Sequence, residues 1–158
     1  MRITEGPRGI LQIDNARIVY RNFAGEEGKY NRKGDRNFAV VIPDEEMAER
    51  LTDLGWNVKV KPPRDEDDSP FMFLKVKVQF NERGPKVYLK TGTNMVLLDE
   101  ESVDCLDHID IANVDLDLRP YHWDVNGKQG ISAYLQSICV TQEFDRFASR
   151  HEEEYPFE

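Results

Sequence analysis

The sequence has few cysteines, no long apolar run and no apolar leader. Its two cysteines, Cys105 and Cys139, lack the CxxC or metal-ligand spacing of a redox or zinc site. We expect both to be reduced packing residues, with a disulfide between them as the alternative. No apolar segment approaches the ~20 residues of a membrane-spanning helix, and Met1–Glu5 lacks the apolar stretch of a secretory signal. These absences predict a cytoplasmic protein without a membrane partner.

Catalytic motifs are also missing. The chain contains no Walker loop, no GxGxxG, no GxSxG and no HExxH, and its three histidines stand in unrelated contexts. Eight acids and no Lys or Arg occur from Asp99 to Asp117, and carboxylates are ligands that Mg²⁺ prefers. A metal-dependent nuclease therefore stays open as an alternative. Because no histidine pairs with these acids and no calcium-loop pattern fits, we expect no enzyme, no metal and no cofactor.

The net charge of −9 is unevenly distributed along the chain. The segment 17–36 carries six basic residues against three acids, whereas the segments 99–117 and 152–158 contain acids and no Lys or Arg. Local potential matters more for binding than the total charge, so the acidic balance does not exclude a nucleic-acid partner. Solvated charged faces would give the same pattern.

At 158 residues the chain has the length of one domain that buries roughly 70% of its unfolded surface. A helix is expected from Asp44, a capping residue, to Gly55, and a second short helix over 99–108. The run 9–23 lacks one clean alternation, so it predicts a strand that bends or bulges. Further strands are expected at 36–42, 56–61, 71–80, 86–90, 109–119, 121–125 and 128–141.

Turn signals connect these strands into hairpins. Asn126-Gly127 is typical of a type I′ turn and would place Trp123 opposite Gly130. The segment NERGP at 81–85 predicts a hairpin between the strands on either side. The fold class predicted is mainly β (α+β): an antiparallel five-stranded OB-like barrel with extra hairpins and two short helices. Other sheet topologies fit the pattern as well.

The strand at 71–80 has two different faces. Met72, Leu74, Val76, Val78 and Phe80 alternate with a second set that contains Phe71, Phe73, Lys75 and Lys77. Exposed phenylalanines are costly unless something covers them. Single-stranded nucleic acid offers flat bases for the rings and phosphates for the ammonium groups, so we predict a DNA-binding platform here. Alternatively, the mid-chain helix packs over both rings.

Neighbouring segments supply further candidate DNA-binding residues. The strands that flank the predicted platform contribute lysines and an aromatic ring: Lys59, Lys61, Tyr88 and Lys90. A basic loop tip adds Arg32 and Lys33, and the closing hairpin adds Tyr121 and Trp123. Trp123 fits a core position equally well.

The C-terminal residues combine an acidic run with an apolar tip: Glu152, Glu153, Glu154, Tyr155, Pro156 and Phe157. They resemble the tips of bacterial and phage single-stranded DNA-binding proteins, in which the tip recruits replication and repair proteins and competes with DNA. A tethered anion is present at high effective concentration near its own groove. Glu158 departs from the pattern, because it separates the terminal carboxylate from the Phe ring. A plain acidic terminus is the alternative.

The body of the chain resembles a family of phage and mobile-element proteins of Gram-positive gut bacteria. The stretches IPDEEMAERLTDLGWNVKVKPPRDEDDSP and LLDEESVDCLDHIDIANVDLDLRPYHWDVNGKQGISAYLQ carry the resemblance. It implies an OB-fold single-stranded DNA-binding protein acting in replication or recombination, with replication or recombination proteins as partners of the tip. We therefore expect a binding domain at 1–147 and an acidic tail at 148–158. The alternative is a phage assembly module that binds protein and no nucleic acid; the sequence leaves homo-oligomerisation open.

Overall fold

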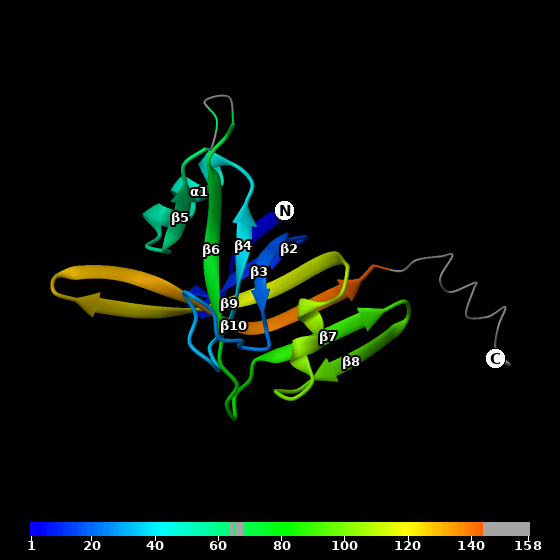
Figure 1. Cartoon of the computed structure of the whole chain (residues 1–158). Helices are drawn as coiled ribbons and strands as arrows, with labels where there is room; N and C mark the ends of the chain where they lie inside the picture. The colour runs from blue at the N-terminus through cyan, green and yellow to red at the C-terminus, as the bar shows by residue number, and fades with distance from the viewer. Residues whose placement is uncertain (64, 66–67, 144–158) are drawn as a thin grey trace, which may run out of the picture.

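The computed structural model describes residues 1–63, 65 and 68–143. Ten strands form one open sheet in the order β1-β2-β9-β10-β6-β4-β3, to which β5, β7 and β8 add (Figure 1). The elements are β1 (Arg2–Glu5), η1 (Pro7–Gly9), β2 (Leu11–Asp14), β3 (Ile18–Asn22), β4 (Arg36–Ile42), α1 (Glu45–Asp53), β5 (Val58–Lys61), β6 (Phe71–Val78), β7 (Lys86–Thr91), β8 (Asn94–Leu98), η2 (Val103–Asp107), β9 (Ile111–Val125) and β10 (Lys128–Gln142).

The mainly β class is confirmed, but two details of the predicted architecture are wrong. The sheet is open and ten-stranded, not a five-stranded barrel. The described residues contain one α-helix, and the segment predicted as a second helix forms the 3₁₀ turn η2, which still buries Val103 and Leu106. The strands that were not predicted from the sequence are β1, which pairs with β2, and β8, which pairs with β7.

The helix α1 begins where its capping residue predicts. Asp44 Oδ1 accepts the backbone N–H of Met47 at 2.7 Å, which satisfies one of the free donors of the first turn. Gly55 follows the helix with a φ of +103°, a conformation that disfavours side chains. Ala48 and Leu51 are buried in the core, so the helix packs on the sheet by the side that carries them.

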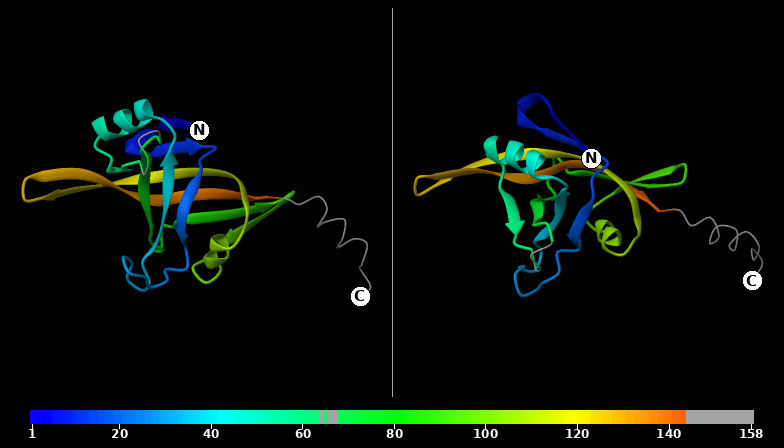
Figure 2. Two further views of the ribbon diagram at one scale, coloured as in Figure 1. Left: turned by 45° about the horizontal axis from the view of Figure 1, so that its top comes forward. Right: turned by 90° about the horizontal axis from the view of Figure 1, so that it is seen from above.

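The β9–β10 hairpin is the longest element and projects from the body as an arm (Figures 1 and 2). Its Asn126–Gly127 turn has positive φ at both residues, and the register places Trp123 opposite Gly130, as predicted. Near the body, Leu118, Leu116 and Val114 of β9 point into the core. The opposite face of the same hairpin stays accessible.

The predicted hairpin of the 71–80 and 86–90 strands is wrong. Both β6 and β7 run parallel to β10, β6 at Ala133–Tyr134 and β7 at Ser137–Thr141. They therefore follow one another along one edge of β10, and the antiparallel partner of β7 is β8. The segment 81–85 does form a turn, but the two strands that flank it pair with β10, which is distant in sequence, and not with each other.

The first strand candidate bends, as predicted, and divides into β2 and β3, which pair with β9 and β4 respectively. Cys105 and Cys139 are free thiols, so the alternative of a disulfide is wrong. No helix among the described residues is long and apolar enough to cross a membrane. Within the same residues, no group of three or more His, Cys, Asp or Glu could hold a metal ion.

Candidate nucleic-acid interface

The outer face of β6 carries the predicted platform. Met72, Leu74, Val76 and Val78 point inward and are buried, while the alternate residues point outward. Phe71 and Phe73 are half-buried, and neither belongs to the core or packs against it. The helix α1 does not cover them, so the packing alternative is wrong.

Phe71 and Phe73 form a ring cluster with Tyr20 of β3. The two phenylalanine centroids lie 5.5 Å apart, and Tyr20 meets both rings edge-on, at 6.2 Å from Phe71 and 5.8 Å from Phe73. Such geometries stabilise aromatic pairs. Tyr20 has a φ of +53° at the irregularity of β3 and is 54% exposed. The cluster therefore presents ring surface to solvent.

Lys61 of β5 places a positive charge on this ring cluster. Its Nζ lies 2.9 Å from the Tyr20 hydroxyl, 4.7 Å from the centroid of the Tyr20 ring and 5.8 Å from that of Phe73. Lys59 lies directly opposite Phe73 in the β5–β6 register and is exposed. Rings and ammonium groups thus share one surface, as stacking on bases and contact with phosphates require.

A second ring site lies where β6 meets β10. Tyr134 neighbours Lys77, whose Nζ is 5.7 Å from the ring centroid. Arg119 of β9 holds its guanidinium carbon 5.3 Å from the same centroid, and Tyr121 meets the ring edge-on at 5.7 Å. The predicted residues Lys77 and Tyr121 therefore come together around a tyrosine that the prediction missed.

Trp123 continues this face along the arm. Its register partner is Gly130, and a Cβ at that glycine would lie 2.8 Å from Trp123 Cε2, so the ring lies flat against bare backbone. Trp123 is half-buried, and it lies on the same side of β9 as Tyr121 and Arg119. It is therefore a surface ring and not a core residue.

The outer face of β6 is hollowed at three places. A depression of about 370 Å³ adjoins Phe71, Tyr20 and Lys61, and one of about 380 Å³ adjoins Phe73 and Lys75. A pocket of about 790 Å³ lies at Gln79, which has the same outward parity. The three follow one another along a single strand, so the face is grooved rather than flat.

The loop 24–35 borders the second depression through Tyr30 and Asn31. The predicted residues Arg32 and Lys33 are exposed on this loop. The loop is held at its start by Asp107, whose two carboxylate oxygens accept the backbone N–H groups of Phe23 and Ala24 at 2.7 and 3.0 Å. A fixed loop start places its basic tip beside the groove.

Two of the six basic residues in 17–36 have structural contacts. Arg21 donates to the carbonyls of Leu106 and Ile109, both at 2.7 Å. Arg36 donates to the carbonyl of Phe23 at 2.6 Å and lies 4.0 Å from Glu100. These two guanidiniums hold the η2 region and the start of the loop in place. A count of charges along the sequence does not separate such structural arginines from DNA-binding ones.

Tyr88 and Lys90 lie on β7, apart from the ring cluster. In the β7–β10 register Tyr88 pairs with Cys139 and Lys90 with Thr141, and Asp115 stands opposite Cys139 on β9. Burial raises the pKa of the Cys139 thiol, Asp115 raises it further and Lys90 opposes this. The neighbouring acid makes this end of the face less favourable for a polyanion. The tail residues 152–157 lie outside the described residues.

Sequence reasoning missed Tyr20, Tyr134 and Arg119. The register set by Asn126-Gly127 pairs Arg119 with Tyr134, so a count along both strands of that hairpin would have found them. Tyr20 gives no such signal, because its position depends on an irregular backbone.

The fold matches solved structures of phage single-stranded DNA-binding proteins. The C-terminally truncated protein from bacteriophage Enc34 superposes with a TM-score of 0.53 at 12% identity, covering 92% of this chain and 97% of that chain. The Enc34 protein in complex with ssDNA gives 0.51 at 12% identity, covering 92% and 93%. At these identities the likeness shows the fold alone. No curated protein sequence matches the chain.

The fold thus defines the class: an OB-like β fold shared with phage single-stranded DNA-binding proteins. The chain belongs to the family described as "Putative phage ssDNA-binding domain", whose match covers residues 4–157. Single-stranded DNA binding, predicted from the sequence, is confirmed at the level of this family.

Proposed function

We propose that the chain binds single-stranded DNA without sequence preference and that the strand lies along the outer face of β6. One observation carries this: Tyr20, Phe71 and Phe73 form a solvent-facing ring cluster with Lys61 above it, away from the core. Bases would stack on this cluster and on Tyr134, and phosphates would meet Lys59, Lys61, Lys75 and Lys77. Stacking contributes about 1–3 kcal/mol per base and tolerates any sequence.

Fluorescence anisotropy with labelled oligo-dT tests the proposal. Binding should weaken as salt rises, with a log–log slope of about −0.7 per phosphate neutralised. The double variant Phe71→Ala/Phe73→Ala should lose most of the affinity. A matched control is Met95→Ala/Leu97→Ala, which removes two exposed apolar side chains from β8, away from β6. Absence of binding at low salt, or equal affinity of both double variants, contradicts the proposal.

The biological role that fits this binding is protection and handling of DNA during phage or mobile-element replication and recombination. We place the protein in the cytoplasm of the host cell and assign it no reaction of its own, since the family is defined by binding. A chain that ignored oligo-dT and formed defined oligomers alone would instead be an assembly module.

We also propose a division into a binding domain, 1–147, and an acidic tail, 148–158. The residues Glu152–Phe157 would compete with DNA for the basic face and recruit replication or recombination proteins. Deletion of residues 151–158 should tighten oligo-dT binding, and most strongly at low salt, because charge competition is screened. Unchanged affinity at low salt would show that the tail does not compete.

A further inference from the structure

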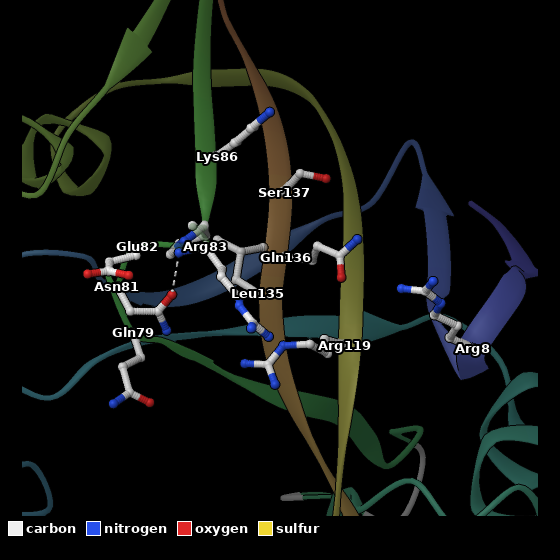
Figure 3. Close-up of a pocket in the computed structure, with 12 residues that line it drawn as sticks. Arg8, Gln79, Asn81, Glu82, Arg83, Lys86, Arg119, Leu135, Gln136 and Ser137 are labelled. Atoms are coloured by element: carbon white, nitrogen blue, oxygen red, sulfur yellow. Dashed lines mark hydrogen bonds between the residues drawn. The ribbon is translucent and has the colours of Figure 1, made fainter.

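The pocket at the Gln79 end of the β6 face is basic. Figure 3 shows its lining, which comes from four separate segments. Arg8 projects from η1, Arg83 from the turn after β6, Lys86 from the start of β7 and Arg119 from β9. Glu82 is the one acid among the lining residues.

The backbone around the pocket is held in place. In the 81–84 turn, Asn81 and Gly84 exchange two backbone hydrogen bonds, and Asn81 Oδ1 accepts the N–H of Arg83 at 2.9 Å. On the other side, β10 has a bulge at Gln136, where the register with β9 shifts. The pocket therefore lies between a closed turn and a bulged strand.

None of the four positive charges of the pocket has an ion-pair partner among the described residues. The ion pairs among the described residues are Arg36–Glu100 and Arg50–Glu5, so none of the four pocket cations takes part in one. Figure 3 shows the guanidiniums of Arg83 and Arg119 directed into the same space. In a protein with 30 acids and 21 bases, four unpaired cations in one concavity form a site for an anion.

The ligand chemistry follows from what lines the pocket. None of its lining residues is aromatic, so the pocket offers bases no surface for stacking. Gln79 directly follows β6 and is eight residues from Phe71, a distance of about 26 Å at 3.3 Å per residue. Arg119 joins the two regions, because its guanidinium also lies on the Tyr134 ring.

We propose that this pocket binds consecutive backbone phosphates of the DNA strand whose bases stack on the ring cluster, an inference that rests on the proposed function. The face is thus divided: at the Phe71 end the rings hold bases and the lysines beside them meet phosphates, whereas the four cations at the Gln79 end hold further phosphates without any stacking. The pocket therefore contributes a separate part of the salt dependence of binding.

The test measures oligo-dT affinity by anisotropy over a range of salt concentrations. Arg83→Gln/Lys86→Gln should reduce the log–log salt slope by about 1.4, which is two phosphates at about 0.7 each. Between 50 and 200 mM salt the variant would then lose about sevenfold less affinity than the wild type. Arg8→Gln alone should reduce the slope by about 0.7. Phe71→Ala/Phe73→Ala should weaken binding with the slope unchanged.

The matched control is Arg2→Gln/Arg50→Gln, which removes the same charge from β1 and α1. Its slope should equal that of the wild type. If Arg83→Gln/Lys86→Gln has the wild-type slope, or the same slope as the control, the pocket does not hold phosphates. If the wild type fails to bind oligo-dT at all, the proposed function itself is wrong, so the two failures are distinguishable.

Discussion

The ammonium of Lys61 contacts Tyr20 twice, at 2.9 Å from the hydroxyl oxygen and 4.7 Å from the ring centroid. This pair joins β5 to β3 across β6 and β4, so the ring cluster and its cation come from segments 41 residues apart in the chain. Because the cation lies over a ring on which we propose that a base stacks, we expect Lys61 to move toward a phosphate when DNA binds.

Replacement of Tyr20 by alanine should weaken oligo-dT binding by about 1–3 kcal/mol, because one stacking surface is lost. Tyr20→Phe keeps the ring and removes only the hydroxyl contact with Lys61, so it should retain most of the affinity. Anisotropy titration compares both variants with the wild type. Equal loss in both would mean that the hydroxyl, not the ring, carries the interaction.

Gly130→Ala should displace the Trp123 ring, because the added Cβ would overlap Cζ2 and Cε2 of that ring. The described tryptophans differ in burial: Trp56 is 4% exposed and Trp123 is half-buried. We expect a red-shifted emission in the Trp56→Phe background, where Trp123 alone reports. Gly28→Ala is the control, since a Cβ there meets nothing within 4 Å. An unshifted spectrum would contradict the packing of Trp123 on Gly130.

Asp107→Ala should destabilise the fold by about 1–3 kcal/mol, because the N–H groups of Phe23 and Ala24 lose their acceptor in a part-buried site. Urea denaturation gives the free energy of unfolding. Asp104→Ala removes an exposed carboxylate from the same 3₁₀ turn and should change the midpoint little. Equal midpoints for both variants would show that Asp107 does not anchor the loop.

Acid should weaken the turn before η2. The Ser102 hydroxyl donates to Asp99 Oδ1 at 2.8 Å, and with the N–H groups of Ser102 and Glu101 it holds the pKa of that carboxyl below 3.8. Since the folded pKa lies below the unfolded one, this contribution is present above pH 3.8 and is lost as pH falls through the folded pKa.

The Asp99→Asn variant removes this titration, so its stability should fall less steeply with acid than that of the wild type. Urea midpoints measured from about pH 5 downwards provide the comparison. Ser102→Ala should have a similar but smaller effect, because it removes only the largest of the interactions. Parallel profiles for all three proteins would exclude the Asp99 hydrogen bonds as a source of acid sensitivity.

Features that depend on local chemistry were predicted from the sequence. Asp44 caps α1, Asn126-Gly127 sets the β9–β10 register, and β6 separates an apolar side from Phe71 and Phe73. In each case neighbours within a few residues supply the signal, and the resulting period or turn type is fixed by geometry.

Features that depend on distant partners were not predicted. The sequence at 81–85 predicts a hairpin turn, yet both flanking strands pair in parallel with β10 and not with each other. Lys61 and Tyr20 meet only because β5 and β3 lie on opposite sides of the β4–β6 pair. Arg36 counts among the six basic residues of 17–36, but its guanidinium donates to the carbonyl of Phe23. Pairing between remote segments leaves no mark in local periodicity.

The position of β10 also constrains when the protein can fold during synthesis. Val76 pairs with Ala133 and Lys86 pairs with Ser137, so β6 and β7 emerge from the ribosome long before β10, their shared neighbour. Loop closure over such separations is slow, and the unpaired edges are exposed to aggregation until residues 128–142 arrive. A stall of translation inside β9 would therefore leave a nascent chain in which β6 and β7 lack their shared neighbour, although the rings of Tyr20, Phe71 and Phe73 had already been made.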